Sequence, residues 1–291
     1  MPGRHISFIL IFALIISSFN SCNIINPPEP QASYIKVDTI MVNNTTGQGG
    51  NFHNIEDIWV YVNGQLVGTY EAPFTVPVLP SGEQQLTLEA GVKESGQSSF
   101  HVIYPFMTSY RSDTLLPPGD TLNINPVFNY TDTEVPFFED FEDLGTGFEI
   151  TTASDTTLNT VNDSNCLDGQ CGYFANDISR PNFDCRTADV FPLPKDAKIF
   201  AEVSYKCTQE FTVGVFAKEY TGEGFSDVRY PILTLFDSPE WNKVYINLTD
   251  IVAETTNATE YRLFISAQPM ENNEDFVAGE VYLDNIKILH Y

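Results

Sequence analysis

The sequence predicts an all-β protein built from two β-sandwiches in series, a small one over residues 34–130 and a jelly roll over residues 131–291. Apolar and polar residues alternate in many short segments, which is typical of strands with one buried face. No stretch after residue 21 keeps a helical apolar period for three turns. A length of 291 residues corresponds to about two domains and is enough for two hydrophobic cores.

The composition excludes several classes of protein. Asp and Glu number 39 against 14 Lys and Arg, which gives a net charge of −25. Such a surface repels phosphate groups, so nucleic acid is excluded as a partner. The hydrophobic content of 42% is too high for a disordered chain. The four histidines are too widely separated for a His-rich zinc centre; they are His5, His53, His101 and His290.

Residues 1–21 have the pattern of a cleaved signal peptide. A positively charged start precedes the apolar run Ile6–Phe19, which is too short to span a bilayer as a helix. The Ser21-Cys22 pair that follows resembles the lipobox of bacterial lipoproteins, in which the cysteine carries the lipid. Phe19 departs from the Leu, Val or Ile usual at its position. An ordinary secretory signal with a chance cysteine is the alternative.

Lipidation at Cys22 implies an outer-membrane lipoprotein, on either the cell surface or the periplasmic face, with the lipid anchor as its only membrane contact. Residues 22–33 contain three prolines and no hydrophobic periodicity. We expect this segment to form an extended tether between the anchor and the first domain.

The first sandwich is predicted from a β-hairpin near its start. Residues 58–62 alternate between aliphatic and aromatic side chains, and Asn63-Gly64 follows directly. This dipeptide between apolar runs is the strongest short-range hairpin signal, because both residues accept the positive φ of a type I′ turn. Residues 65–70 are the expected return strand, and residues 84–90 alternate again. Short strands separated by such turns favour a small β-sandwich.

The same region resembles two known families. Asp57–Glu71, with Leu79–Glu83 before the next strand, is similar to the PEGA-type surface module, which has an Ig-like β-sandwich fold. Together with Tyr104–Tyr110, it looks like a family of uncharacterised Bacteroidota surface lipoproteins. The resemblance implies architecture and location, and it assigns no catalytic residue.

The second sandwich begins at an acidic junction, with six carboxylates and no Lys or Arg in residues 132–143. A solvated linker is the usual explanation of such a run. Three phenylalanines interrupt it, so we expect residues 137–143 to form the first strand. Alternation predicts further strands at residues 198–206, 211–218, 240–250, 261–267 and 281–289. This many antiparallel strands with long loops indicates a jelly roll.

Three segments of the second domain resemble carbohydrate-binding-module jelly rolls. They are Phe138–Asp143 at its start, Glu240–Leu248 and Val281–Ile288 at its end. The resemblance implies the fold, and it implies a glycan as the ligand of this domain.

Asp284 is the most informative residue of the last expected strand, because simple alternation places it on one face with Tyr282 and Ile286. A carboxylate on an inward face is costly unless it is paired or bound to a cation. Jelly rolls of the resembled type commonly hold a structural calcium between the first and last strands. The resemblance therefore implies calcium ligands at Asp284 and at Asp140 or Glu142, with other oxygens completing about six to eight. The alternative is a carboxylate that accepts backbone N–H groups or lies at a strand edge.

Exposed aromatic rings are the expected sugar contacts, because they stack on the apolar faces of pyranose rings. Loop positions are favoured, since most of the 22 Phe and 14 Tyr must form the cores. We expect Trp241, at a strand start, to be structural. The candidate ligand-binding residues are Tyr220, Phe225, Tyr230, Tyr173 and Phe174.

Four cysteines follow Cys22, and an even number in an exported protein indicates disulfides. Cys166 and Cys171 flank a turn-like sequence, which favours that pair and leaves Cys185 with Cys207. Free buried thiols are the alternative.

Asp-Thr followed by Ile, Leu or Thr occurs four times and is similar to the O-glycosylation acceptor pattern of Bacteroidota. Three-residue motifs also recur by chance. The candidate acceptors are Thr39, Thr114, Thr121 and Thr156.

The sequence contains no nucleophile elbow, zincin, Walker A or other paired hydrolase motif. The leading prediction is a lipid-anchored, non-catalytic cell-envelope protein that recognises a glycan or another macromolecule through its jelly roll. One alternative is an accessory subunit that docks onto an outer-membrane protein complex and binds no sugar. Another is an unrecognised polysaccharide-active enzyme, because carboxylates are abundant in residues 131–291.

Overall fold

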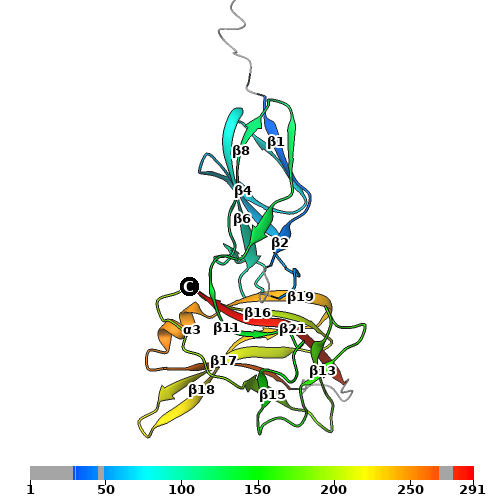
Figure 1. Ribbon diagram of the computed structural model, residues 1–291, viewed down its shortest axis with the longest axis vertical. Helices are drawn as coiled ribbons and strands as arrows, with labels where there is room; N and C mark the ends of the chain where they lie inside the picture. Colours follow the sequence, from blue (N-terminus) through cyan, green and yellow to red (C-terminus); the bar gives the residue numbers. More distant parts are fainter. Residues whose placement is uncertain (1–28, 30, 45–48, 269–277) are drawn as a thin grey trace, which may run out of the picture.

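The protein is described from a computed structural model (Figure 1). Strands β1–β21 and the short helix α3 (Thr249–Glu254) make up its regular structure within the described ranges. The predicted all-β fold is confirmed. The described residues are 29, 31–44, 49–268 and 278–291.

The predicted signal peptide, residues 1–21, and Cys22 lie outside the described residues. Across the part of the chain that is described, no helix has the length and apolar character needed to cross a membrane.

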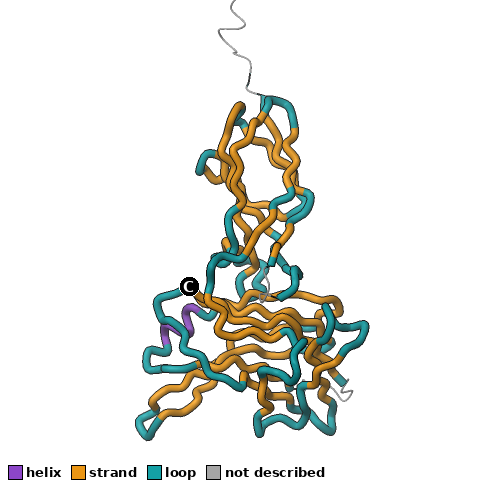
Figure 2. The backbone as a smooth tube through the Cα atoms, in the orientation of Figure 1, coloured by secondary structure: helices purple, strands orange, loops and turns teal. Residues whose placement is uncertain are grey.

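The N-terminal sandwich, formed by β1–β10, encloses a core between a three-stranded and a five-stranded sheet (Figure 2). The first sheet has the order β5-β1-β9 and the second β4-β3-β6-β7, with β8 also paired to β6, while β2 and β10 form a separate parallel pair. The strands are β1 (Ser33–Val37), β2 (Met41–Asn43), β3 (Asp57–Val62), β4 (Gln65–Glu71), β5 (Phe74–Val78), β6 (Gly82–Lys93), β7 (His101–Ile103), β8 (Tyr110–Leu116), β9 (Thr121–Ile124) and β10 (Val127–Asn129).

The predicted hairpin is present as β3 and β4. Asn63 and Gly64 have φ values of 50° and 74°, as a type I′ turn requires. Alternate residues of β3, Ile58, Val60 and Val62, are buried in the core. Local turn chemistry and hydrophobic period therefore agree with the fold.

The C-terminal sandwich consists of a six-stranded and a five-stranded antiparallel sheet packed around a second core. The six-stranded sheet has the order β13-β14-β21-β16-β19, with β11 also paired to β21, and the five-stranded sheet has the order β12-β15-β20-β17-β18. The strands are β11 (Glu134–Glu139), β12 (Phe148–Ile150), β13 (Asn159–Val161), β14 (Cys171–Asn176), β15 (Phe183–Thr187), β16 (Ile199–Cys207), β17 (Phe211–Tyr220), β18 (Phe225–Leu235), β19 (Ser238–Asn247), β20 (Tyr261–Ala267) and β21 (Gly279–His290).

The first strand of this sandwich differs from the prediction. β11 ends at Glu139, whereas the prediction placed a strand over residues 137–143. The chain turns because Phe141 takes a left-handed φ of 61° and its ring enters the core. Gly172 makes room for that ring, since a Cβ there would lie 2.5 Å from Phe141 Cζ.

The N-terminal sandwich stands on the outer face of the six-stranded sheet (Figure 1). Its core includes three side chains from that face, Phe200, Tyr245 and Leu289. The backbone N–H of Ser95 also donates to the carbonyl of Tyr245 at 2.8 Å. The N-terminal sandwich therefore covers the part of this outer side that carries Phe200, Tyr245 and Leu289, whereas the five-stranded sheet faces away from it.

A buried group of charges lies at this contact. Glu202 forms ion pairs with Lys243 at 2.7 Å and Lys287 at 3.4 Å. The hydroxyls of Tyr104 and Tyr130, from the N-terminal sandwich, donate to the same carboxylate at 2.6 and 2.8 Å. Burial alone would raise the pKa of Glu202, but the two ammonium groups hold it at about 2. Partners from both sandwiches thus converge on one carboxylate and fix their relative orientation.

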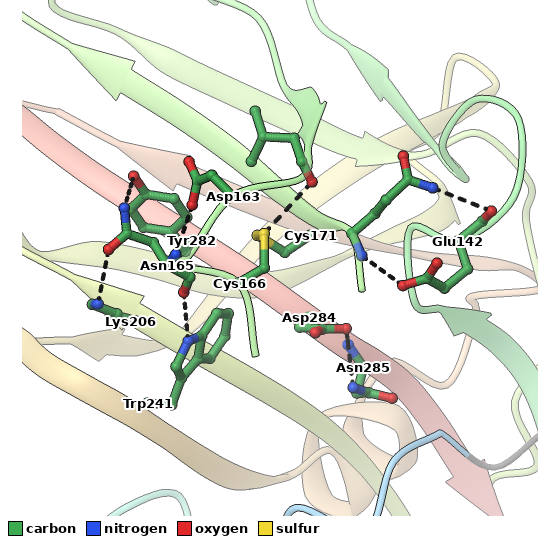
Figure 3. Close-up of a disulfide and its surroundings, with 12 residues drawn as sticks. Glu142, Asp163, Asn165, Cys166, Cys171, Lys206, Trp241, Tyr282, Asp284 and Asn285 are labelled. Carbon is green, nitrogen blue, oxygen red and sulfur yellow. Dashed lines mark hydrogen bonds between the residues drawn. A yellow bond between two sulfur atoms is a disulfide. The ribbon is translucent and has the colours of Figure 1, made fainter. Parts of the chain in front are cut away.

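The cysteine prediction is half correct. Cys166 and Cys171 form a disulfide, as predicted (Figure 3). The predicted Cys185–Cys207 bridge is wrong, because both thiols are free and buried. Cys185 lies on β15 and Cys207 on β16, so they belong to different sheets. The Cys207 thiol donates instead to the carbonyl of Phe236 at 3.3 Å.

Candidate functional site

The outer face of the five-stranded sheet carries half of the six arginines in the sequence. Val213 and Val215 of β17 and Leu263 and Ile265 of β20 point into the core, so the alternate side chains point outward. We define the arginine face as the outward residues Glu149 of β12, Asp184 and Arg186 of β15, Phe216 of β17, Asp227 and Arg229 of β18, and Arg262 and Phe264 of β20.

Arg229 is the central residue of this face. Its guanidinium carbon lies 3.8 Å from the centre of the Phe264 ring and 5.3 Å from that of Phe216. Such stacking is typical of arginine, whose planar cation is attracted to the face of an aromatic ring. Nη1 of Arg229 also donates to Asp184 at 2.6 Å, and Asp184 is held in turn by the Thr151 hydroxyl at 2.6 Å.

A glycine allows this arrangement to lie flat on the sheet. Gly214 of β17 is the register partner of Phe264. A Cβ at Gly214 would lie 2.5 Å from Cζ of the Phe264 ring and 2.3 Å from the carbonyl oxygen of Tyr230. The missing side chain therefore provides the space in which Phe264 supports Arg229.

The charges of the arginine face are balanced. Glu149 accepts hydrogen bonds from Arg186 at 2.7 Å and Arg262 at 2.6 Å, and Arg186 also pairs with Asp227 at 3.0 Å. The hydrogen bond from Arg186 lowers the pKa of Glu149. Together with the Arg229–Asp184 pair, three cations meet three carboxylates, although the whole chain carries a charge of −25.

The face is hollowed beside Arg229. A cavity of about 320 Å³ opens there, within the ~300–1,000 Å³ range of ligand pockets. Its polar lining consists of donors and acceptors held by the sheet or its flanking loops; the residues are Asn182, Asp184, Thr212, Arg229, Ser266 and Gln268. The hollow therefore offers paired donors and acceptors beside a stacked cation and aromatic ring, with no excess of either charge.

Two of the predicted ligand-binding residues are exposed, outside this hollow. Tyr220 and Phe225 face one another across the tip of the β17–β18 hairpin, with ring centres 5.7 Å apart. Both rings are exposed, as expected for a surface contact. They remain predictions, at one end of the same sheet.

Three other predicted ligand-binding residues are placed differently. Phe174 is fully buried and stacks on Phe183 at 3.6 Å, so its prediction as a ligand contact is wrong. Tyr230 packs against the hydrophobic core, on the side of the sheet opposite to Arg229, and its hydroxyl donates to Glu219 at 2.6 Å. Tyr173 is half-buried on β14 of the other sheet. Neither tyrosine belongs to the arginine face.

Asp284 sits at a β-bulge, which the simple alternation did not anticipate. Asn285 has φ 47°, and the pairing of β16 with β21 shifts register at this point. Leu283 before the bulge and Ile286 after it both enter the core, so Asp284 is not in the inward row. The expected apolar row through Tyr282, Asp284 and Ile286 is therefore broken.

Asp284 is nevertheless a buried residue, with a relative exposure of 1%. Oδ1 accepts from the backbone and side-chain N–H groups of Asn285 at 2.7 and 3.0 Å (Figure 3). Oδ2 has no hydrogen-bond partner among the described residues. Burial, with a smaller contribution from the charges of Asp140 and Asp168, outweighs the backbone N–H groups of Asn285 and Asp168 and raises the pKa of Asp284 to about 7.

The other two predicted calcium ligands are engaged with local backbone. Glu142 accepts from the N–H of Gln170 at 2.6 Å, and Asp140 accepts from the N–H of Glu142 at 3.2 Å. In the part of the chain that is described, no three His, Cys, Asp or Glu side chains are grouped so that they could hold a metal. The structure thus gives Asp284 a buried oxygen without a partner, and it does not bring Asp140, Glu142 and Asp284 together as a ligand set.

The candidate glycosylation acceptors differ in accessibility. Thr39 and Thr121 are exposed and Thr114 is half-buried, all on the N-terminal sandwich. Thr156 is 8% exposed, so its prediction as an acceptor is wrong for the folded chain. Trp241, expected to be structural, is half-buried and donates from Nε1 to the carbonyl of Asn165 at 2.7 Å.

The sequence reasoning missed the arginine face. A signal was present in the expected strand 261–267, where Arg262, Phe264 and Ser266 share one side. Phe264 is a large apolar residue between two polar ones on that side, so the alternation does not mark it as part of an outer surface. The site becomes visible only when β15, β17, β18 and β20 are aligned.

The comparisons with known proteins give distant structural similarity to carbohydrate-binding-module β-sandwiches. No protein-family model matches the sequence, and no curated protein matches it. A carbohydrate-binding module of the β-sandwich superfamily, described for its promiscuous specificity, is 11% identical with a TM-score of 0.38, over 90% of this chain and 99% of that one.

Two further similar structures match about half of the chain. The second CBM22 xylan-binding domain of a Paenibacillus barcinonensis protein is 15% identical with a TM-score of 0.37, over 53% of this chain and 99% of that one. The CBM22 and GH10 modules of a Clostridium thermocellum endo-1,4-β-D-xylanase, complexed with xylohexaose, are 15% identical with a TM-score of 0.39. That match covers 54% of this chain and 28% of the xylanase chain.

Proposed function

We propose that the chain is a non-catalytic glycan-binding protein whose binding surface is the arginine face of the C-terminal sandwich. The observation that carries this proposal is the Arg229–Phe264 stack beside a hollow lined with hydrogen-bonding groups. A sugar ring presents hydroxyl groups at its edge and C–H groups on its faces. The stack offers a flat surface to the C–H groups, and the Arg229–Asp184 pair offers a donor and an acceptor to the hydroxyls.

The balanced charge favours a neutral glycan. Each guanidinium of the face is already paired with a carboxylate, so an acidic sugar would have to displace a protein carboxylate. The chain as a whole is strongly negative and repels polyanions. A neutral polysaccharide neither displaces a protein carboxylate nor is repelled by the negative charge of the chain.

The position of the face suits a protein held at its N-terminal end. The described chain begins at the end of the N-terminal sandwich that is farthest from the C-terminal sandwich (Figure 1). The arginine face lies on the opposite side of the C-terminal sandwich from this end. A lipid at Cys22 would then hold the protein at the outer membrane with its glycan-binding face directed away.

The lipid anchor is tested by fractionation. Cys22→Ser is expected to move the protein from the membrane to the soluble fraction, because the several acyl chains of a lipoprotein hold firmly whereas none remain in the variant. A variant that stays membrane-bound after a salt wash would show that the anchor lies elsewhere.

Calcium at Asp284 is a separate part of the proposal, supported by the buried and unpartnered Oδ2. A bound cation would satisfy that oxygen and stabilise the ionised carboxyl group, with loop oxygens as further ligands. The charge of Asp140 acts on Asp284, which favours Asp140 over Glu142 as a second ligand.

The glycan proposal is tested by affinity electrophoresis on gels that contain one soluble polysaccharide each. Xylan, mixed-linkage β-glucan, galactomannan and polygalacturonate cover neutral and acidic backbones. We expect retardation by at least one neutral polysaccharide and none by polygalacturonate. Release of reducing sugar from any of them would instead establish an enzyme. Unretarded migration on every gel, together with co-purification of an outer-membrane complex, would favour the accessory-subunit alternative.

A further inference from the structure

A second cavity lies where the two sandwiches meet, and it shares no lining residue with the hollow on the arginine face. We name it the junction cavity. Its volume is about 450 Å³, which is in the ~300–1,000 Å³ range of ligand pockets. The N-terminal sandwich forms one wall, with Asn54, Glu56, Lys93 and residues 95–98. The C-terminal sandwich forms the other wall, with Tyr205, residues 233–238 and residues 242–245. Neither sandwich alone would form this cavity.

The walls of the junction cavity are held together by direct hydrogen bonds. The side-chain amide of Asn54 donates to Asn242 Oδ1 at 2.9 Å and to the carbonyl of Lys243 at 3.2 Å. The backbone N–H of Asn54 donates to the hydroxyl of Tyr245 at 3.2 Å. Lys243 is anchored from behind by its ion pair with Glu202 at 2.7 Å. The cavity is therefore preformed, which lowers the ordering cost of binding.

Both lysines at the junction cavity are paired with carboxylates, and Asp237 is an exposed carboxylate of the lining. Lys93 is paired with Glu56 at one wall, and Lys243 is paired with Glu202 beneath the floor. The remaining lining combines amides and hydroxyls with four apolar side chains, Leu233, Leu235, Phe236 and Val244. The hydroxyl of Tyr205 accepts from the Asn242 amide at 3.3 Å, which leaves its own proton for a ligand acceptor. This lining fits a neutral molecule with several hydroxyl groups.

An aromatic ring stands at the mouth of the junction cavity. Phe236, between β18 and β19, lines the cavity and is 65% exposed. A large ring exposed to water at the cavity costs free energy, and that cost is removed when an apolar surface covers the ring. The C–H face of a sugar ring provides such a surface, while its hydroxyls reach the amides of the floor.

We infer that the junction cavity is a second binding site, for a neutral polyhydroxylated ligand of one or two sugar rings. The site is independent of the arginine face, and it gives the N-terminal sandwich a direct part in recognition. The walls bind the ligand edge through Asn242 and Tyr205, and Phe236 packs on one face of the ligand.

The test uses the protein with Arg229→Ala, so that the arginine face is disabled. Cellobiose, xylobiose, maltose and N,N′-diacetylchitobiose are added one at a time, and binding is measured by saturation-transfer difference NMR. The cavity is then altered in two ways, by Phe236→Ala at the mouth and by Gln97→Trp, which fills the space from an exposed lining position. Phe100→Ala and Ser99→Trp are the matched controls, because both residues are exposed and neither lines the cavity.

We expect at least one disaccharide to bind, with a loss of fivefold or more in affinity for Phe236→Ala and for Gln97→Trp and no change for the controls. Binding by none of the four probes would overturn the inference, as would equal binding by the cavity variants and their controls. The glycan proposal for the arginine face is judged separately, by the effect of Arg229→Ala on polysaccharide binding when the junction cavity is intact. The two proposals can therefore fail independently.

Discussion

The guanidinium of Arg229 lies 3.8 Å from the centre of the Phe264 ring and is held there by Asp184 at 2.6 Å. Phe264 is fully buried, although it is on the outer side of its sheet. A ligand on this face therefore meets the guanidinium plane and not the bare ring. The aromatic ring supports the cation, and the carboxylate sets its position.

Gly214→Ala tests the support beneath this pair. The new Cβ would lie 2.5 Å from Phe264 Cζ, so the ring and Arg229 must shift. We expect a loss of about 1–3 kcal/mol in the free energy of unfolding, as for other overpacked sites. Chemical denaturation measures it. Gly50→Ala is the control, because its nearest contact would be 3.9 Å away; equal stability of the two variants would contradict this account.

Glu202→Gln tests the buried charges between the sandwiches. The substitution leaves Lys243 and Lys287 buried without their carboxylate, and we expect a loss of about 3–5 kcal/mol in the free energy of unfolding. The exposed Glu240→Gln is the matched control. A loss no larger than that of the control would show that the carboxylate does not hold the joint together.

The same carboxylate predicts a pH dependence. The pKa of Glu202 is about 2 in the folded chain, against an ordinary value of 4.5. The unfolded state therefore binds the proton first, and the stability due to this group is complete above about pH 4.5 and lost as the pH falls towards 2. Denaturation curves at a series of pH values should therefore show a difference in unfolding free energy between wild type and Glu202→Gln that shrinks as the pH falls from about 4.5 towards 2. A constant difference between them would contradict the assignment.

The cysteines predict a specific labelling pattern. Burial raises the pKa of the Cys185 and Cys207 thiols, so both should resist alkylation in the folded protein. Peptide mass spectrometry should show Cys166 joined to Cys171 and should show the other two labelled only after unfolding. A peptide in which Cys185 is joined to Cys207 would contradict the structure.

The calcium proposal predicts a response to chelation. A cation that binds only the folded state stabilises it by about 2.7 kcal/mol at a hundredfold excess over Kd. Chelator should therefore lower Tm for wild type, and Asp284→Asn should remove the difference between calcium and chelator. Melting curves of wild type that coincide in calcium and in chelator would show that Asp284 is a buried carboxyl group without a metal.

The sequence predicted those elements whose signals are local. The β3–β4 hairpin follows from Asn63-Gly64 and from alternation on both sides, and the structure contains it. The end of β11 could not be predicted in this way, because the left-handed turn at Phe141 depends on the space above Gly172, thirty-one positions away in the chain. Tertiary packing decided that boundary.

The candidate site was harder to predict for the same reason. Arg186, Arg229 and Arg262 are far apart in sequence, and only the strand order β15-β20-β17-β18 brings them to one face. The loop aromatics were favoured because exposure is the usual property of a sugar contact. Phe264 is buried and contributes by supporting Arg229, a role that residue type and loop position do not reveal.

Isothermal titration of the neutral polysaccharide that binds best among xylan, mixed-linkage β-glucan and galactomannan tests the central claim most directly. The titration compares wild type with Arg229→Ala and with Arg180→Ala, a control in which an exposed, ion-paired arginine outside the arginine face is removed. The account predicts that Arg229→Ala weakens binding at least tenfold while Arg180→Ala leaves it unchanged. Equal affinities of wild type and Arg229→Ala would contradict the claim that the arginine face binds glycan.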